Sequence, residues 1–288
     1  MGRGIASDGA SVYVCGIYIA ENSAYSLLLK YDGRGELLFS MMVDSGGTET
    51  AWGISVSDAV YLCGEVGHNT SSAENPGLQA TSMLLTRISL DGDVIWSKEY
   101  SVAFDDVANS VDAEREISVA GYAGFRNGTA KMVLLRYSPE GDLRYSKVFG
   151  EAAIEDIAWG IATAGQYTYV VGHTRSTPTH LADASVCKLG PDGDVLWRDF
   201  NRGDMLDRAR AVTVSGDEVY VVGETYHIGV DMQVLVKKFV SPNFALSPTV
   251  SLSLRLSPLA IGCILLAVEV YVVIRTRRTR SRAKDVAR

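Results

Sequence analysis

The chain is poor in the residue types that most often build metal centres and disulfide frameworks. It has 4 cysteines and 4 histidines among 288 residues. Four cysteines in a chain of this length do not make the disulfide-stapled scaffold of a small secreted domain. Because no H-x-x-H or C-x-x-C spacing occurs, we expect neither a metal site nor a cofactor.

Proline is scarce as well, and helical periodicity is missing from the body of the chain. There are 7 prolines against 28 glycines, so we expect the turns to depend on glycine. No G-x-S-x-G, P-loop or Rossmann fingerprint stands between a strand and a helix. The sequence therefore identifies no catalytic residue, and it favours a non-catalytic protein over an enzyme.

Basic residues are concentrated in one short segment. The net charge is −7, but residues 275–288 alone carry +6. Since Arg255 and Glu269 cancel, residues 1–254 carry −13. An acidic body of this kind argues against nucleic acid as a partner.

An apolar run precedes the basic segment. Residues 256–274 read LSPLAIGCILLAVEVYVVI, interrupted only by Glu269. A helix of this length rises about 28 Å, close to the ~30 Å hydrocarbon core of a bilayer. We expect a transmembrane helix over 258–274, a basic cytoplasmic tail over 275–288 and a Ser/Pro-rich stalk over 240–257. The alternative is a buried helix of a soluble domain.

The basic tail also predicts an orientation. Basic residues beside a span favour the cytoplasmic side, which puts the acidic body outside the cell. Residues 1–6 show no signal peptide, so either the true start lies upstream or the protein is tail-anchored with its body in the cytosol. We favour a single-pass cell-membrane protein with its body outside.

Four short apolar segments recur along the body. One ends in glycine, as in Val12-Tyr13-Val14-Cys15-Gly16, and its closing glycines stand at 16, 64, 121, 172 and 223. The second is a mostly apolar segment whose first copy is Leu27-Leu28-Leu29-Lys30-Tyr31. The third follows a Gly-Asp turn, as in Gly193-Asp194-Val195-Leu196-Trp197. The fourth is rich in small residues, as in Ala51-Trp52-Gly53-Ile54, and also contains Trp159 in its later copy.

Four strands in each repeat of about 50 residues are typical of a β-propeller. We expect an all-β fold over 4–239, with about five four-stranded blades. The small-residue strand should be innermost, since inner strands crowd the axis. The strand that follows the Gly-Asp turn, and that ends in Trp197 in one copy, should be outermost. Trp52 and Trp159 would then face either a central channel or the neighbouring blade.

The repeats resemble a known repeat family. Lys188–Trp197, Asp207–Val212 and Glu218–Thr225 are similar to the bacterial and archaeal SBBP β-propeller repeat and to the related delta-60 repeats. This resemblance covers roughly residues 4–239 and implies a propeller in a surface or secreted protein. It implies no cofactor and no catalytic residue.

Both ends of the repeat array depart from the pattern. The first copy begins inside its inner strand, and in the fifth copy Phe244 replaces the turn glycine, with no Trp after it. The fifth outer strand should therefore be degraded or absent. A segment before Met1 would supply a closing strand, in which case the propeller over 4–239 is incomplete at its N-terminus.

An acidic residue stands two positions before the alanine in four copies of the small-residue strand. These residues are Glu49, Asp106, Asp156 and Asp207. They could form a ring that binds a cation or a basic ligand. The favoured interpretation is structural, in which each carboxylate accepts backbone N–H bonds at its own strand start.

Two sequons, at Asn69 and Asn127, are possible glycosylation sites because both follow the glycine-ending strand and would lie in loops. The function that the sequence favours is a membrane-anchored surface module that binds a glycan, a peptide or an envelope component. The alternative is an extracellular hydrolase or lyase built on propeller loops. Fold alone does not decide between them.

Overall fold

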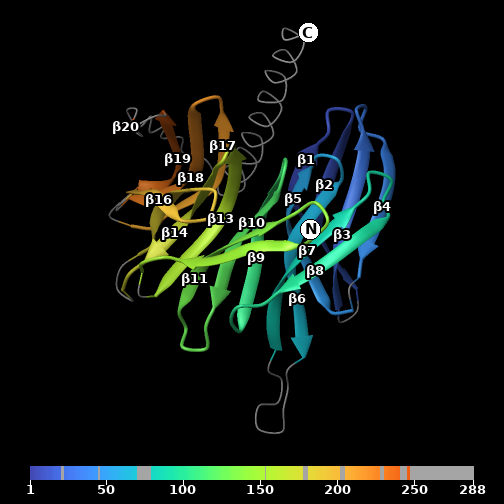
Figure 1. Cartoon of the computed structure of the whole chain (residues 1–288), viewed down its shortest axis with the longest axis horizontal. Coiled ribbons are helices and arrows are strands. Elements are labelled where there is room, and N and C mark those ends of the chain that lie inside the picture. Colours follow the sequence, from blue (N-terminus) through green and yellow to red (C-terminus); the bar gives the residue numbers. More distant parts are fainter. Residues whose placement is uncertain are drawn as a thin grey trace. The chain divides into compact units, whose positions relative to one another are not determined.

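A computed structural model describes residues 1–20, 23–44, 46–69, 79–152, 154–177, 181–201, 205–227, 230–240 and 245–246. Within these ranges every regular element is a β-strand (Figure 1). The all-β prediction is therefore confirmed for this part of the chain. The expected stalk, span and tail, over 240–257, 258–274 and 275–288, lie almost wholly outside it.

Consecutive strands form antiparallel four-stranded meanders, which we call blades. In blades 1, 2, 3 and 5 each strand pairs with the next along the chain. Blade 1 has β1 (Gly2–Ser7), β2 (Ser11–Ala20), β3 (Ser23–Asp32) and β4 (Leu37–Val43). Blade 2 has β5 (Thr48–Val56), β6 (Val60–Asn69), β7 (Gln79–Ile88) and β8 (Val94–Tyr100). Blade 3 has β9 (Asp105–Ala113), β10 (Ile117–Gly124), β11 (Ala130–Tyr137) and β12 (Leu143–Phe149).

Two further blades follow. Blade 4 has β13 (Glu155–Ala164), β14 (Tyr167–Arg175), β15 (Asp183–Leu189) and β16 (Val195–Asn201). Blade 5 has β17 (Asp207–Ser215), β18 (Glu218–His227), β19 (Val230–Val240) and β20 (Ala245–Leu246). Only these two residues of the last strand lie in the described part of the chain, so the expected degradation of the fifth outer strand stays a prediction.

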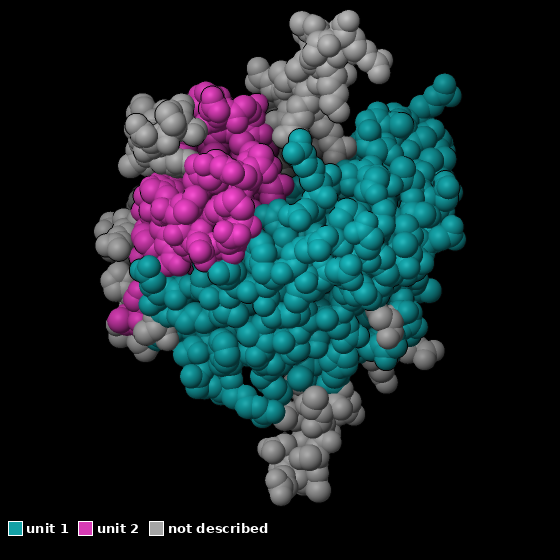
Figure 2. Space-filling model, viewed as in Figure 1, with its two compact units in different colours: residues 1–158 teal, residues 159–288 magenta. Residues whose placement is uncertain are grey.

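The chain divides into two compact units between Ala158 and Trp159, within β13 (Figure 2). In unit 1 the first strands β1, β5 and β9 contact one another in succession. Single parallel pairs, Thr81 with Asp105 and Ala130 with Glu155, link blade 2 to blade 3 and blade 3 to the start of β13. In unit 2, β14 and β15 contact β17.

Small residues let the first strands approach each other, as the pattern predicted. A Cβ atom added to Gly53 would lie 2.9 Å from the carbonyl oxygen of Asn109 on β9. In unit 2, the same atom on Gly160 would lie 2.9 Å from the carbonyl oxygen of Arg210 on β17. The Ala-x-Gly pattern is thus explained by contact between the backbones of consecutive first strands.

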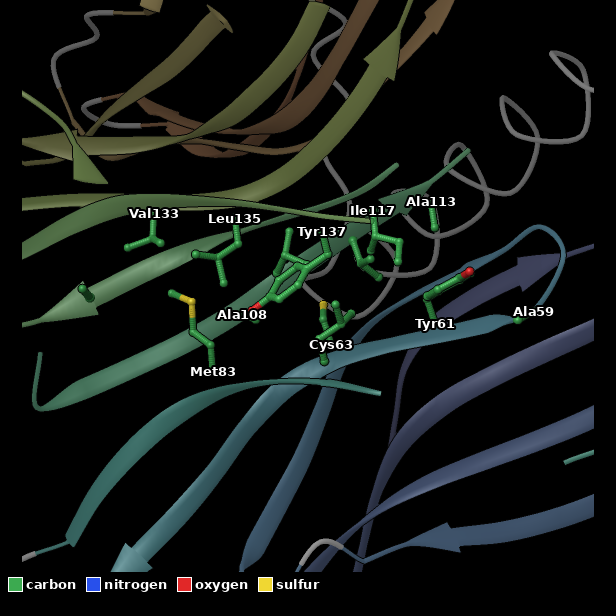
Figure 3. Packing of buried hydrophobic residues seen from close by; sticks show 14 residues of the cluster. Ala59, Tyr61, Cys63, Met83, Ala108, Ala113, Ile117, Val133, Leu135 and Tyr137 are labelled. Atoms are coloured by element: carbon green, nitrogen blue, oxygen red, sulfur yellow. The ribbon is translucent and has the colours of Figure 1, made fainter. Parts of the chain in front are cut away.

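The core lies between the faces of neighbouring blades. Figure 3 shows Tyr61 and Cys63 of β6 and Met83 of β7 facing Leu135 and Tyr137 of β11. All five side chains are at most 3% exposed. Each buried large side chain of this kind stabilises the fold by about 1.5–3 kcal/mol relative to exposure, and the contact fixes one blade against the next.

The turn of one blade is held by side chains from the third and fourth strands of the blade before it. Nζ of Lys30 donates to the carbonyl of Leu90 at 2.8 Å, and the Phe39 ring packs against the adjoining turn at Gly92. One repeat later, Nε1 of Trp96 and Nη1 of Arg87 donate to the Pro139 carbonyl at 3.3 and 3.0 Å. In unit 2, Trp197 packs edge-on against Phe239, with centroids 5.2 Å apart. The repeated aromatic residue therefore joins consecutive blades.

Candidate functional site

The four repeated carboxylates are buried at the starts of their strands. Asp106 accepts the backbone N–H groups of Val102 at 2.5 Å and Ala103 at 2.9 Å, together with the hydroxyl of Ser101 at 3.0 Å. Asp106 is fully buried. Three donors within five residues fix the chain as it leaves β8 and enters β9.

The other three carboxylates have different surroundings. Asp156 accepts the backbone N–H of Ala152 at 3.0 Å and the ammonium group of Lys131 at 3.1 Å. Asp207 accepts Nδ2 of Asn201 at 2.9 Å and the hydroxyl of Thr225. Glu49 is fully buried on β5. Among the residues that the structure describes, no three His, Cys, Asp or Glu side chains form a group that could hold a metal ion.

Both sequons were expected in loops, and the structure places one of them, at Asn127, in a turn. Asn127 is exposed in the turn between β10 and β11, and its Oδ1 accepts the backbone N–H of Thr129 at 3.0 Å and the Thr129 hydroxyl at 2.7 Å. Gly128 takes a φ of 80° between them. Asn69 is the last residue of β6, and its side chain lies outside the described part.

A β-bulge recurs in the first strands, and the sequence did not predict it. The ladder between the first and second strand skips one residue in blade 1, blade 2, blade 3 and blade 5. The skipped residues are Arg3, Trp52, Asn109 and Arg210. Bulges interrupt the pairing, turn a side chain to a new direction and occur often beside active sites. We call these four residues the bulge residues.

The bulge explains the closing glycine of the second strand. A Cβ atom on Gly64 would lie 1.8 Å from the carbonyl oxygen of Thr50, and one on Gly121 would lie 1.8 Å from that of Val107. The same clash would occur at 2.1 Å for Gly16 and at 2.0 Å for Gly223. Only glycine fits opposite the bulge. The repeated glycine was therefore the sequence signal from which the bulge could have been inferred.

In unit 1 the bulge residues of blades 1 and 2 interact with each other. The guanidinium of Arg3 lies 4.2 Å from the centroid of the Trp52 ring. Nε1 of Trp52 donates to Oε1 of Glu65 on β6 at 3.1 Å. Burial raises the pKa of the Glu65 carboxyl above its usual 4.5, the Trp52 hydrogen bond lowers it, and the charge of Asp105 raises it further.

Blade 3 contributes an amide and a phenol to unit 1. Asn109 is 9% exposed and its Nδ2 donates to the carbonyl of Ala158 at 2.8 Å. Tyr122, which follows the closing glycine, occupies the position that Glu65 holds in blade 2. Burial, and then the negative charges of Asp105 and Glu65, raise the pKa of the Tyr122 hydroxyl, so this group is a neutral hydrogen-bonding side chain at physiological pH.

Unit 2 has a similar set on β13, β14, β17 and β18. The guanidinium of Arg210 lies 4.8 Å from the centroid of the Trp159 ring. Nε1 of Trp159 donates to Nδ1 of His173 at 2.8 Å. Oε1 of Glu224 on β18 accepts a hydrogen bond from Arg210 at 2.7 Å and another from Arg208 at 3.4 Å. Each unit thus combines an arginine over a tryptophan ring with a carboxylate on a second strand, which is buried at Glu224 and half-buried at Glu65.

A separate open hollow of about 440 Å³ lies in unit 1. Its lining includes Tyr25, Asp44, Thr48 and His68. His68 pairs with Glu99 at 3.0 Å. The hollow is polar, and it contains none of the bulge residues.

No helix among the described residues is long and apolar enough to cross a membrane. The predicted span over 258–274 lies outside those residues, so its topology stays a prediction.

Comparison with known proteins shows similarity of fold. The chain matches no protein-family model and no curated protein sequence. A neuraminidase-like protein of A/little yellow-shouldered bat/Guatemala is 9% identical with a TM-score of 0.56, over 88% of this chain and 82% of that one. A Synechocystis apocarotenoid oxygenase mutant is 12% identical with a TM-score of 0.54, over 88% of this chain. The chain spans only 61% of the oxygenase.

The β-propeller domain of the Trilobed protease from Pyrococcus furiosus is also similar, at 10% identity and a TM-score of 0.46. That match covers 82% of this chain and 68% of the protease chain. At identities this low, the similarity shows a shared fold and does not show a shared function. The chain is an all-β protein of consecutive four-stranded meanders, and its fold is similar to those of the neuraminidase-like protein and the oxygenase.

Proposed function

We propose that the chain is a non-catalytic binding module of the SBBP type, and that its bulge residues contact the ligand. One observation carries this proposal. The scaffold around the bulge repeats, with alanine before the bulge residue in blades 2, 3 and 5 and a closing glycine opposite it. The bulge residue itself changes between arginine, tryptophan and asparagine.

Repetition of a residue in every blade is expected where folding requires it. Variation at one position inside a constant scaffold is instead expected where each blade presents a different group to a ligand. Tryptophan, arginine and asparagine are groups that bind polar ligands, because they combine flat apolar surface with directed N–H donors. The ligand classes that fit are a glycan, a peptide or an envelope component.

The proposed location is the cell surface. It is supported by the length of the apolar run over 258–274, by the +6 charge of the tail and by the acidic body. Protease added to intact cells should remove the body and leave the tail. Protection of the body would support the tail-anchored alternative with the body in the cytosol.

The proposed function is tested on arrays of defined glycans, peptidoglycan fragments and peptides, probed with the full-length chain. Binding should fall at least tenfold in Trp52→Ala for a ligand of unit 1 and in Arg210→Ala for a ligand of unit 2, because each variant loses a side chain that the ligand of its unit contacts. Leu38→Ala is the matched control, since Leu38 is 54% exposed on the fourth strand of blade 1 and should bind normally.

Two results would contradict the proposal. Binding that stays unchanged in every bulge variant would move the site elsewhere, for example to the hollow beside His68. Cleavage of an arrayed glycan or peptide by the wild type would favour the hydrolase or lyase alternative.

A further inference from the structure

We propose that unit 2 binds the carboxylate of an acidic saccharide, such as a uronic-acid residue, through Arg208 and Arg210. This inference rests on the proposed function and names the ligand chemistry of one of its sites. It is carried by the arrangement of two guanidinium groups about one buried carboxylate.

The two arginines lie on the same face of β17. Ala209 between them is fully buried, whereas the Arg208 and Arg210 side chains are 31% and 32% exposed. The bulge at Arg210 brings both guanidinium groups to the same oxygen, Oε1 of Glu224. Both are therefore held in position while remaining open to solvent at one side.

Glu224 binds only some of the N–H donors of the Arg208 and Arg210 guanidinium groups. Oε1 of Glu224 accepts one hydrogen bond from each guanidinium group, from Nη1 of Arg208 and from Nη2 of Arg210. Each guanidinium carries five N–H donors. Nε of Arg208 is buried without a hydrogen-bond partner among the described residues. A bound oxyanion that bridged the two guanidinium groups would add charge-assisted hydrogen bonds.

The local charge favours an anion. Two guanidinium groups face one carboxylate, which leaves a formal charge of +1 on this face. Asp207 is the next acidic residue on β17, but it alternates to the opposite face, where Asn201 and Thr225 bind it. The acidic charge elsewhere is screened beyond about 8 Å at physiological ionic strength.

Neighbouring contacts make the pair rigid before any ligand arrives. Arg210 packs over the Trp159 ring at 4.8 Å, and His173, which is 1% exposed, accepts the indole N–H at 2.8 Å. Preorganised donors lose less entropy on binding. Because both arginines converge on a single carboxylate oxygen, they favour one compact planar anion over a run of acidic side chains, and arginine matches carboxylate geometry.

The test titrates the full-length chain with trigalacturonate, using tryptophan fluorescence and calorimetry. The trimethyl ester of trigalacturonate, a triglutamate peptide and inorganic sulfate are the comparison probes. We expect trigalacturonate to bind, its ester to bind at least tenfold more weakly, and the affinity to fall as salt is raised.

The variants separate charge from geometry. Arg208→Gln and Arg210→Lys should each raise the Kd for trigalacturonate by about tenfold to a hundredfold, since lysine keeps the charge but not the planar fork. Arg144→Gln, at an exposed site in unit 1, should leave the Kd unchanged. Melting curves identify any variant that fails to fold, and the conservative Arg210→Lys provides the test in that case.

The inference is overturned if trigalacturonate fails to bind, if its ester binds equally well, or if both arginine variants bind like wild type. Preferential binding of triglutamate or of sulfate would replace it by a peptide site or a free-anion site. Each of these results leaves the proposed function standing as long as the array shows a ligand whose binding depends on the bulge residues.

Discussion

Nζ of Lys131 lies 3.1 Å from Oδ2 of Asp156, and the same ammonium group donates to the backbone carbonyls of Gly150 and Ala152. A carboxylate and two carbonyls are the oxygen ligands that a calcium ion would use. The lysine therefore takes the place of a cation at this carboxylate, which bears on the alternative of a cation-binding ring.

From this contact we predict that calcium does not raise the melting temperature of the wild type. Lys131→Met should destabilise the fold by about 1–3 kcal/mol, because the Asp156 side chain, only 5% exposed, loses a charged donor. Urea denaturation measures the loss. Arg144→Met, at an exposed position, is the control. A calcium-dependent shift that disappears in Asp156→Ala would show that the carboxylates bind cations after all.

The second prediction concerns Asp106. Asp106→Ala should lower the free energy of unfolding by about 0.5–2 kcal/mol, by analogy with capping side chains, since the N–H groups of Val102 and Ala103 lose their acceptor. Ligand binding should not change. The exposed neighbour Asp105 supplies the matched variant, Asp105→Ala, which should cost less. An equal loss in both would argue that Asp106 has no special role.

The third prediction tests why the second strand closes on glycine. Gly64→Ala should destabilise unit 1 severely or prevent folding, because its Cβ would lie 1.8 Å from the Thr50 carbonyl oxygen. Gly67→Ala, on the same strand, is the control. Its nearest atom would be an ordinary 3.5 Å away, so it should change the melting temperature by only a few degrees. Wild-type stability in Gly64→Ala would mean that β5 carries no bulge in solution.

The fourth prediction is a pH dependence at Glu65. Its pKa is raised in the folded state, chiefly by burial. A carboxyl of this kind contributes stability that is complete below its unfolded pKa of about 4.5 and is lost as the pH rises through the higher folded pKa.

The melting temperature of the wild type should therefore fall, relative to Glu65→Gln, as the pH is raised from about 4.5. Trp52 fluorescence should follow the same titration, since its indole N–H is bonded to Glu65. Glu36→Gln at an exposed turn should behave like wild type. A constant difference between wild type and Glu65→Gln at all pH values would contradict the assignment.

The sequence was a good guide to the strands and a poor guide to the site. Spacing of the closing glycines predicted five repeats of four strands, because turn residues and apolar runs are local features. Trp52 was recognised as part of a first strand, yet its direction depends on the register between β5 and β6. Register is a property of two strands together, and a one-residue irregularity is not visible in the pattern of either strand alone.

The same reason applies to the carboxylates. Their position two residues before an alanine marked them as equivalent, but the structure gives them unequal partners, with backbone N–H groups at Asp106 and an ammonium group at Asp156. Lys131 is separated from Asp156 by 25 positions, and nothing in the repeat pattern indicated that contact.

The turn of one blade contacts the third and fourth strands of the blade before it, and this arrangement has a consequence for biosynthesis. The Lys30 and Phe39 side chains belong to blade 1 and hold a turn of blade 2, while Arg87 and Trp96 of blade 2 hold a turn of blade 3. The receiving surface in each case is translated before the turn that it receives. A nascent chain leaving the ribosome could therefore add its blades one by one, each docking on a surface already made, as expected of repeat proteins with nearest-neighbour contacts.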